Sequence, residues 1–572
     1  MNEENLVPDA QPENAAGLPE PGTAADQSGS PDFGLSIPAG VDPDLIPYLL
    51  AAAEEDSEED EEDTDLTPEE LAAQNLEALR TIVKETLLAG ADPELIAEIM
   101  GEADPDPDFA DDEEGAALDP REAALDEAEA ESAMHALYQQ LLNRAPEHDF
   151  DPTLDRTKEV FYILGDPQDS YPSVHVAGTN GKTSTTRLAS ALLEAFGLRV
   201  GTFTSPHLES VRERIQVNGT PVSAAEFLAF WDDVAPYIDM VDAKAKEAGG
   251  PQISYFEVLT IMALAGFADV PVDVAVVECG MGGRFDSTNV LDSGVQVITP
   301  ISLDHQQWLG ESLPEIAGEK AAIIKDKSVV VVAKQPAEVL PVLEARCEQT
   351  DSVMRLQGRD WEVLDRTPGV GGQMVTVRTP AATYQEMFVP LHGAHQAQNA
   401  AAALVAVEAM MGGKALPPEV VEAGFLQARS PGRLEVVRRS PTVLVDAAHN
   451  PAGVAVMREA LVETFPSSYL VGVFTAMADK NIEAMLVEAE QILEQLVITV
   501  LPGDRAADAD QLKEIAEDVF GEDRVHLVEE LPEAIDKAVE LSDRPTDPSL
   551  QRAVVVFGSI YLAGAATTLM RM

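Results

Sequence analysis

The chain has 572 residues, of which 45% are hydrophobic and 24% are charged, so it can bury a substantial core and is long enough for two or three domains. Its formal net charge of -65 opposes nonspecific binding to nucleic acid and adsorption to anionic membranes, so we expect neither as a partner. Two cysteines imply no disulfide framework, the acidic N-terminus does not resemble a signal peptide, and no apolar run approaches the ~20 residues of a spanning helix. These features together predict a cytoplasmic protein.

Residues 1–131 form an acidic extension with 40 acidic and three basic residues, and we expect most of it to be disordered. Within it, residues 42–50 and 92–100 are similar acidic-hydrophobic segments, and residues 66–88 have the pattern of an amphipathic helix. Such segments fit either docking to a protein partner or transient helices in a solubilising tail. We favour the tail, because composition alone is a weak basis for a partner.

From residue 132 onward, short apolar runs alternate with helical patterns, which predicts an α/β fold with a mainly parallel sheet. We expect a central nucleotide-binding domain over 132–430 and a smaller Rossmann-like domain over 431–572, joined near Pro431-Gly432. The expected strands are 174–177, 199–204, 274–278, 295–301 and 329–333 in the first domain, and 442–446, 469–475, 497–501 and 553–557 in the second.

A glycine-rich loop follows the first of these strands and precedes a helix expected over 183–196. Its residues are Gly178, Thr179, Asn180, Gly181, Lys182 and Thr183, followed by Ser184. Glycines let backbone amides face a phosphate, the helix N-terminus adds partial positive charge, and a lysine neutralises the outer phosphates. Val176 stands where the usual P-loop has a further glycine, so this is a shortened variant. A chance glycine-rich turn is the alternative, but the flanking strand and helix favour a nucleotide site.

Further motifs follow the loop in a fixed order along the chain. They are Thr204-Ser205-Pro206-His207-Leu208, Glu213-Arg214-Ile215, Ser254-Tyr255-Phe256-Glu257, the run from Glu278 to Asn289, Leu303-Asp304-His305, the run from Ile316 to Ala321, the run from His392 to Ala400, Pro431-Gly432-Arg433-Leu434-Glu435, the run from Asp446 to Pro451, and Gly558-Ser559-Ile560-Tyr561-Leu562. With the loop, this order resembles the Mur ligase and folylpolyglutamate synthase superfamily, and its folate branch in particular, over residues 132–572.

The resemblance implies a site for ATP and Mg²⁺ that draws on both halves of the chain. It implies that Ser205, Glu278 and His305 bind magnesium, and that Lys320, if carbamylated, helps to hold a second ion. The alternative for Lys320 is an ordinary helix lysine paired with a glutamate. The implied ATP contacts from the second half are Asn399, Arg433, Asp446 and His449, and the implied catalytic residues are Lys182, His305, Lys320 and Arg433.

The resemblance also implies the substrates, which are dihydropteroate, folates and L-glutamate. It places the substrate contacts at Thr204, Pro206, His207, Phe256, Arg284 and Asp286. The expected activity is ligation of glutamate through an acyl phosphate, by an enzyme that we expect to be a monomer. Two departures, Phe285 for a common leucine and Ala447 for a common glycine, alter no charged or ligating group.

Two other functions stay open from the sequence. One is a Mur-type ligase that acts on a different carboxylate, such as a cell-wall nucleotide precursor, although the 204–208 and 285–286 motifs argue against it. The other is a P-loop ATPase switch that binds a protein partner through the acidic extension. That function would not explain the second half of the chain, to which the resemblance assigns further ATP contacts.

Overall fold

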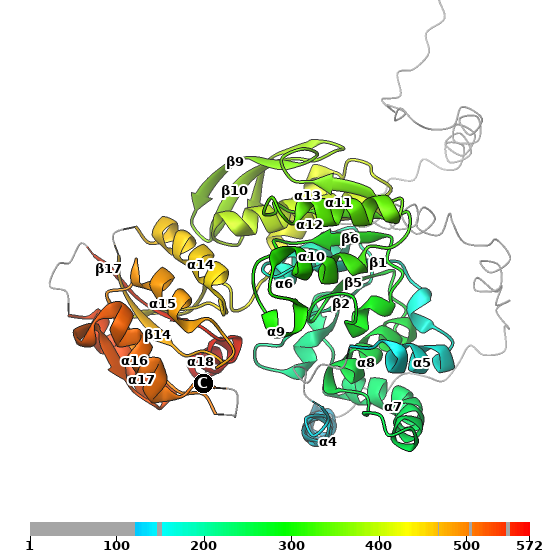
Figure 1. The fold of residues 1–572 in the computed structure, drawn as a ribbon, viewed down its shortest axis with the longest axis horizontal. Helices are drawn as coiled ribbons and strands as arrows, with labels where there is room; N and C mark the ends of the chain where they lie inside the picture. Colours follow the sequence, from blue (N-terminus) through cyan, green and yellow to red (C-terminus); the bar gives the residue numbers. More distant parts are fainter. Residues whose placement is uncertain (1–119, 146–151, 467, 503–505, 545–549, 572) are drawn as a thin grey trace, which may run out of the picture. The chain divides into compact units, whose positions relative to one another are not determined.

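The computed structural model describes residues 120–145, 152–466, 468–502, 506–544 and 550–571 (Figure 1). Residues 1–119 of the expected extension, with the similar segments 42–50 and 92–100 and the amphipathic pattern over 66–88, lie outside these residues. Helix α4 (Pro120–Leu141) runs through the domain boundary that we expected at residue 131. Residues 120–131, which we placed in the extension, are therefore helical, and the same helix buries Met134, Leu137 and Leu141 further along.

An eight-stranded sheet forms the centre of the first domain, in the order β4-β3-β2-β5-β1-β6-β7-β8. Its strands are β1 (Ser173–Ala177), β2 (Val200–Phe203), β3 (Ile215–Val217), β4 (Thr220–Pro221), β5 (Val274–Glu278), β6 (Val295–Ile298), β7 (Val329–Val332) and β8 (Val353–Leu356). The six strands from β2 to β8 in this order are parallel, and β3 and β4 add an antiparallel edge. The expected mainly parallel sheet is confirmed, and its strands end at one edge, where β1 and β5 deliver the loop at Gly178 and the carboxylate of Glu278.

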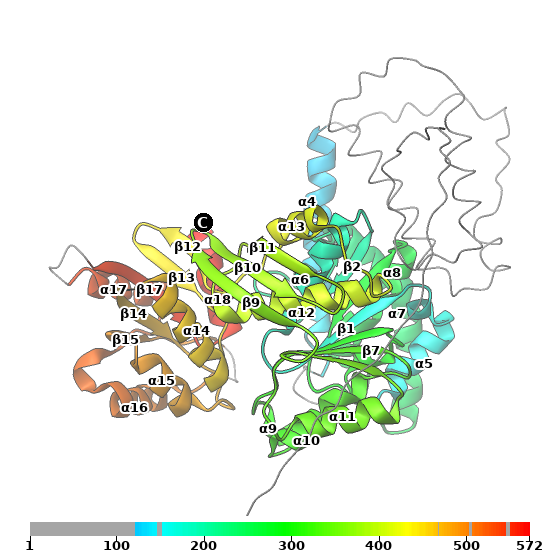
Figure 2. The same cartoon turned by 90° about the horizontal axis from the view of Figure 1, so that it is seen from above.

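Helices cover both faces of this sheet because its central strands alternate buried side chains on two sides. One face packs on α6 (Lys182–Ala195), α12 (Ala394–Met410) and α13 (Pro418–Gln427). The other packs on two groups of helices: α4, α5 (Asp155–Leu164), α7 (Ala224–Glu247) and α8 (Tyr255–Asp269) on one side, and α10 (Leu313–Lys320) and α11 (Leu340–Gln349) on the other. Figure 2 shows α10 and α11 opposite α12 across the sheet. The short helix α9 (Gln306–Leu309) precedes α10.

A second, three-stranded antiparallel sheet was not expected from the sequence. It consists of β9 (Glu362–Gly369), β10 (Gly372–Arg378) and β11 (Thr383–Val389). Its inner face joins the core around α12, where Trp361, Val375 and Tyr384 are almost fully buried. Arg366 of β9 also forms a two-pronged ion pair with Glu463 of α14 (Pro451–Thr464) in the second domain.

The second domain is a six-stranded sheet in the order β12-β13-β17-β14-β15-β16, in which only β12 is antiparallel to its neighbour among the described strands. The strands are β12 (Glu435–Arg439), β13 (Thr442–Val445), β14 (Ser468–Phe474), β15 (Gln495–Ile498), β16 (Val525–Leu527) and β17 (Gln551–Phe557). One face packs on α14, α15 (Ile482–Glu490) and α16 (Ala509–Phe520), and the other on α17 (Leu531–Ser542) and α18 (Ile560–Arg571). The Rossmann-like expectation for this half agrees with these two helical layers.

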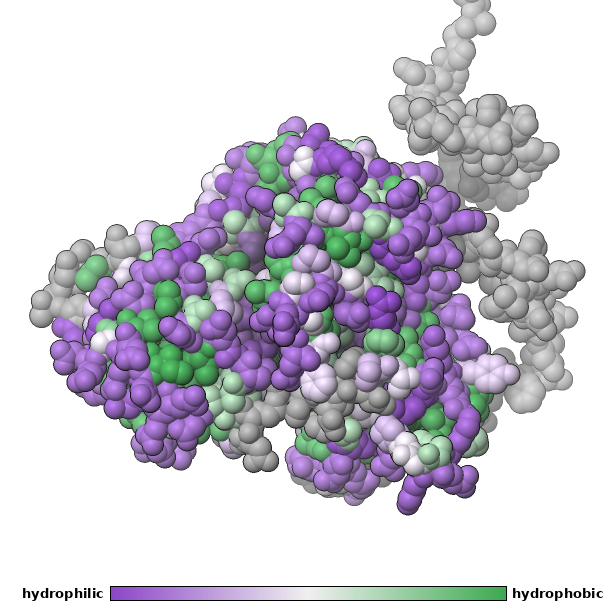
Figure 3. All heavy atoms as spheres, in the orientation of Figure 1, coloured by the Kyte–Doolittle hydropathy of each residue, from purple (hydrophilic) through white to green (hydrophobic). Residues whose placement is uncertain are grey.

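The surface in the view of Figure 3 is mostly hydrophilic, with hydrophobic residues in scattered patches. None of the helices in the described ranges combines the length and apolar character that a membrane-spanning segment requires.

Candidate active site

A cavity of about 820 Å³ opens where the parallel strands of the first sheet end, and residues of both domains line it. Most of the residues expected from the sequence lie on its walls. These are Thr179, Asn180, Gly181, Lys182, Thr183, Ser184, Ser205, Pro206, Phe256, Glu278, Asp286, His305, Asn399, Arg433, Asp446 and His449. Motifs spread over some 270 residues of sequence therefore meet around one space.

The glycine-rich loop lies between β1 and the first turn of α6, as the motif requires. Gly178 has a φ of 149°, and a Cβ there would lie 1.9 Å from Thr299 Oγ1, so no other residue fits. Gly181 has a φ of 91°, and its Cβ would lie 2.7 Å from the side-chain oxygen of Asn399. The loop therefore packs against Thr299, directly after β6, on one side and against Asn399 of α12 on the other.

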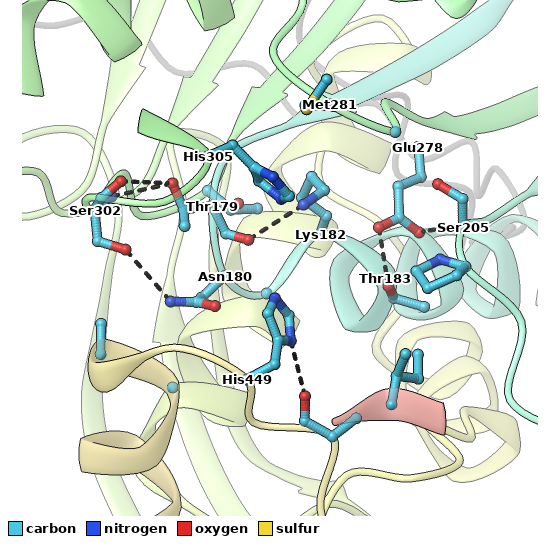
Figure 4. A pocket seen from close by; sticks show the side chains of 18 of the residues that line it. Thr179, Asn180, Lys182, Thr183, Ser205, Glu278, Met281, Ser302, His305 and His449 are labelled. Carbon is cyan, nitrogen blue, oxygen red and sulfur yellow. Dashed lines mark hydrogen bonds between the residues drawn. The ribbon is translucent and has the colours of Figure 1, made fainter. Parts of the chain in front are cut away.

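Two lysines turn their ammonium groups toward the backbone of this loop. Lys182 Nζ donates to the carbonyl of Thr179 at 3.2 Å (Figure 4), and Lys320 Nζ donates to the carbonyl of Gly178 at 2.7 Å. Lys320 is only 4% exposed, and burial together with the nearby charge of Lys182 lowers its pKa to about 7. A buried lysine amine beside the phosphate loop therefore has unusual access to its neutral form.

Glu278 ends β5 and lies 1% exposed behind the loop. Thr183 Oγ1 donates to one carboxylate oxygen at 2.9 Å, and the backbone N–H of Ser205 donates to the other at 3.2 Å (Figure 4). Burial raises the pKa of Glu278, while Lys182, these two hydrogen bonds and Arg433 act against that rise. The structure thus gathers one carboxylate and two hydroxyl-bearing residues at the start of α6.

His305 lies on the opposite wall, and in Figure 4 its ring points toward Lys182. Its backbone is left-handed, with a φ of 49°, and burial lowers its pKa to about 4. The neighbouring Asp304 joins the two domains: it accepts from Lys480 Nζ at 2.7 Å and from Asn450 Nδ2 at 3.1 Å, and His449 Nε2 lies 3.6 Å away. The three partners all belong to the second domain, so this carboxylate links the two domains beside the cavity.

A second link across the cavity joins the loop itself to the second domain. The amides of Asn180 and Asn450 pair reciprocally, with both N–O distances at 3.1 Å. Asn450 also caps α14 by accepting from the N–H of Gly453, so its orientation is set by the helix. The position of the loop and the position of α14 are therefore coupled.

Other residues of the second half approach the loop from the side of α12 and β12. Asp446 is buried and accepts the N–H groups of Leu434 and Ala448, and burial raises its pKa. The bond from Leu434 holds the turn that carries Arg433 to the cavity. Ser430 contacts Ser184 at 2.9 Å, which fixes the interdomain joint to α6.

Phe256 and Asp286 lie at the end of the cavity away from α12. Asp286 is buried and accepts from the N–H of Met281 at 2.8 Å and from the hydroxyl of Thr288, which shapes the turn after β5. Phe256 begins α8, whose N-cap Ser254 forms a capping box with Glu257. An aromatic ring and a carboxylate acceptor at one end suit a flat heteroaromatic substrate with N–H donors.

Five expected site residues do not line the cavity. Gly178 begins the loop but faces away from the cavity toward Thr299, Lys320 lies behind the loop, and Thr204 is buried. His207 is turned away and accepts from Arg214 Nε at 2.9 Å, and Arg284 pairs with Glu319 at the surface. The structure does not place the side chains of Thr204, His207 and Arg284 on this cavity, and their role as substrate contacts stays a prediction.

Several lining residues were not singled out from the sequence. Arg156, Trp308, Gln357, Gln398 and Lys480 line the cavity, although we assigned them no role there from the sequence. Asn450 does not line it but contacts Asn180 and Asp304 beside it. No sequence pattern marks Lys480 as a site residue, because a single lysine after a strand resembles any surface lysine. Only the tertiary pairing with Asp304 singles it out.

Comparison with known proteins agrees with this geometry. Residues 432–560 match the family model of the Mur ligase glutamate ligase domain. The chain is 43% identical over 445 residues to the dihydrofolate synthase/folylpolyglutamate synthase of Mycobacterium tuberculosis. The match covers 74% of this chain and 91% of that protein. It is 35% identical over 369 residues to the protein of the same description from Bacillus subtilis, covering 64% of this chain and 85% of that one.

Solved structures give the same result. Folylpolyglutamate synthase of M. tuberculosis, in complexes with ADP and AMPPCP, superposes with a TM-score of 0.74 at 42% identity, covering 77% of this chain and 99% of that one. The Escherichia coli enzyme FolC, in complex with DHPP and ADP, superposes with a TM-score of 0.66 at 26% identity, covering 77% and 97%. The chain belongs to the dihydrofolate synthase/folylpolyglutamate synthase family of the Mur ligases.

Proposed function

We propose that this glutamate ligase acts on both dihydropteroate and folate glutamyl chains, with ATP and Mg²⁺. The γ-phosphoryl group of ATP passes to the substrate carboxylate, which gives an acyl phosphate and ADP. The amine of L-glutamate then attacks the carbonyl carbon, the amide forms, and inorganic phosphate leaves. The observation that carries this proposal is the shared cavity, in which the glycine-rich loop faces Arg433 and His449 of the second domain.

Lys182 and Arg433 approach the cavity from different domains. A transferred phosphoryl group carries negative charge on its peripheral oxygens, and fixed cations around it lower the barrier without a covalent step. We assign this role to Lys182 from the loop and to Arg433 from the turn held by Asp446. Because no side chain needs to act as a nucleophile, catalysis rests on charge stabilisation and alignment.

Magnesium suits the group around Glu278. No three His, Cys, Asp or Glu residues gather closely enough to hold a metal ion within the described part of the chain. Magnesium prefers oxygen ligands and is commonly held by one or two carboxylates together with waters and phosphate oxygens, so a single buried carboxylate between two hydroxyl residues fits it. We assign Glu278, Ser205 and Thr183 to this ion, with His305 as the expected further ligand. The ion would neutralise charge between the phosphates.

Lys320 fits the modification that the family resemblance implies. Carbamylation requires a neutral amine, and the lowered pKa of about 7 makes that form accessible near neutrality. In the structure the ammonium group donates to Gly178, so the modified side chain would present an anion beside the phosphate loop. We propose that it supports a second magnesium ion there.

We base the proposal of activity on dihydropteroate, as well as on folates, on the end of the cavity at Phe256 and Asp286. The E. coli relative is described in complex with DHPP and ADP, and the relatives from M. tuberculosis and B. subtilis carry both activities in their descriptions. Phe256 offers a stacking face, and Asp286 is held by backbone donors with its carboxylate on the cavity wall. We therefore propose both activities in one site.

A substrate panel tests the proposal. Purified protein is incubated with ATP, Mg²⁺ and L-glutamate and with dihydropteroate or tetrahydrofolate, in buffer equilibrated with carbon dioxide, and ADP and glutamylated product are measured. We expect both folate substrates to give stoichiometric ADP and product, and a cell-wall nucleotide precursor to give neither. Well-folded protein that releases ADP without ligation would support the ATPase switch, and activity on one substrate alone would restrict the function to one synthase.

A further inference from the structure

Residues 205–210 form a loop that begins with Ser205 on the cavity wall and extends from there to the second domain. At its start, the N–H of Ser205 donates to Glu278. Three residues further on, the side chain of Leu208 packs against the hydrophobic cluster of the second domain, which is built by β13, β14, β17, α17 and α18. A residue of the first domain thus takes part in the core of the second.

The backbone of this loop is in direct contact with α18. A Cβ added at Gly564 would lie 1.9 Å from the carbonyl oxygen of Leu208, so the helix can lie on the loop only because position 564 has no side chain. Gly432, at the start of the second domain, approaches the side chain of Leu208 from elsewhere, with its Cβ position 3.1 Å from Leu208 Cδ1. Leu208 is therefore held between both ends of the second domain.

The next residue adds polar contacts to the same helix. Glu209 accepts from Thr568 Oγ1 at 2.9 Å and from Arg571, both on α18. Exposed pairs of this kind contribute little to stability, so we regard them as setting the register of the contact.

The loop is also rigid between its two ends. The carboxylate of Glu213 accepts the N–H groups of Leu208, Glu209 and Ser210, at 2.9, 2.8 and 2.8 Å. Thr204, just before the loop, pairs through its N–H with the carbonyl of Arg214. The N–H groups of Ser205, Leu208, Glu209 and Ser210 are all held by glutamate carboxylates, so we expect a displacement of Leu208 to reach Ser205 and Glu278.

We propose that Leu208 and Gly564 are positioning residues, through which the docking of the second domain sets the geometry of the magnesium group at Ser205 and Glu278. The inference rests on the proposed assignment of that group. Its consequence is that magnesium and nucleotide bind fully only when α18 is seated on the 205–210 loop. Neither residue lines the cavity, so an effect of changing them on magnesium binding is indirect. For Leu208 it passes through the 205–210 loop, whereas α18 also reaches the cavity through Ile560 and Tyr561, so the comparison of binding in Mg²⁺ and in EDTA decides between the two routes.

The test uses Leu208→Ala, which removes the side chain from the second core, and Gly564→Ala, which forces α18 away from the loop. Leu426→Ala, at a half-exposed leucine of α13, and Ala565→Gly, at the exposed neighbour of Gly564, are the matched controls. ADP binding is measured by calorimetry with Mg²⁺ and with EDTA, and ligation is measured at varied Mg²⁺. Circular dichroism and thermal unfolding report whether each variant folds.

We expect both variants to weaken ADP binding in Mg²⁺ and to raise the half-saturating Mg²⁺ concentration by about tenfold, with kcat partly restored by excess Mg²⁺. Binding in EDTA and both controls should stay near wild type. Glu209→Gln, which changes only a surface contact and so tolerates substitution, should give a smaller change in the same direction.

Folded variants that bind ADP and Mg²⁺ like wild type would overturn the proposal. So would an equal loss of ADP binding in Mg²⁺ and in EDTA, because the effect would then not pass through the magnesium group. If wild type binds ADP with Mg²⁺ but ligates nothing, the proposed function fails while the binding data still decide the role of the loop.

Discussion

Lys182 supplies the positive charge of the phosphate loop. It begins α6, lines the cavity and is oriented by the carbonyl of Thr179. Removal of a cation that stabilises a transferred phosphoryl group typically costs about 10² to 10³ in rate, so Lys182→Ala should lower kcat by at least that much. The measurement is product formation at saturating ATP, with the exposed Lys246→Ala as control. Near-normal turnover in Lys182→Ala would contradict the role assigned to the loop.

Glu194 on α6 is a half-buried carboxyl group far from this chemistry, and it makes stability depend on pH. Its Oε1 has no hydrogen-bond partner within the described part of the chain, and burial raises its pKa from 4.5 to about 7. Between those two values the folded state holds more protons than the unfolded state, so the stability of the protein falls as pH rises.

Glu194→Gln should therefore match wild type below about pH 4.5 and become progressively more stable than wild type up to about pH 7. The difference should reach at most about 3.5 kcal/mol, since one pKa unit corresponds to about 1.4 kcal/mol. Urea unfolding of both proteins at several pH values measures it. A difference that does not change with pH would show that the carboxyl group titrates normally in the folded protein.

At the scale of single elements, the N-terminus of α8 shows how a cap serves a site. Ser254 and Glu257 form a capping box, and the same carboxylate receives Arg156 at 3.2 Å and Thr157 at 3.2 Å. Phe256 lies between the two capping residues and lines the cavity. Helix α7 has a matching box, Ser223 with Glu226, at an exposed position away from the cavity.

Ser254→Ala and Ser223→Ala should each destabilise the protein by about 1 kcal/mol, because each loses an N-cap hydrogen bond. Only Ser254→Ala should also raise the KM for the folate substrate, by about threefold to tenfold, since it loosens the turn that presents Phe256. Thermal unfolding and steady-state kinetics separate the two effects. Equal KM values for the two variants would mean that this cap acts on stability alone.

The nine strands that the sequence predicted lie close to observed strands. The expected strand 274–278 coincides with β5, and the others differ from the observed strands by a few residues at most, because buried parallel strands are continuous apolar runs that contrast with their flanks. The sequence did not predict the strands β3, β4, β8, β12 and β16, nor the antiparallel strands β9 to β11. The outer faces of β9 to β11 are polar or exposed, as at Asp365 and Thr367, so their pattern resembles that of a loop.

For the whole molecule, a buried ion pair is among the contacts that join the two domains. Asp304 and Lys480 are 9% and 8% exposed in their side chains and form an ion pair at 2.7 Å between the domains. Asp304→Ala leaves the ammonium group of Lys480 buried without this partner, which typically costs about 3 to 5 kcal/mol. The double variant Asp304→Ala with Lys480→Met should regain at least half of that loss.

Urea unfolding measures this double-mutant comparison, and Glu517→Ala is its control. Glu517 pairs with Lys513 on the surface of α16 at 2.8 Å, and the loss of such an exposed pair should change stability by less than about 1 kcal/mol. If Asp304→Ala is no more destabilised than Glu517→Ala, the pair between the domains is not desolvated in solution.

The sequence alone determined the phosphate loop, the two α/β halves and the order of motifs that identifies the family, because these depend on local backbone requirements and on residue spacing. Only the tertiary structure decided which side chains face the cavity. It turned His207 and Arg284 away, brought in Lys480 and Asn450 as partners of Asp304 and Asn180, and placed Leu208 of one domain in the core of the other. The physical reason is that these contacts join residues far apart in the chain, so no local pattern records them and only the packing of two domains specifies them.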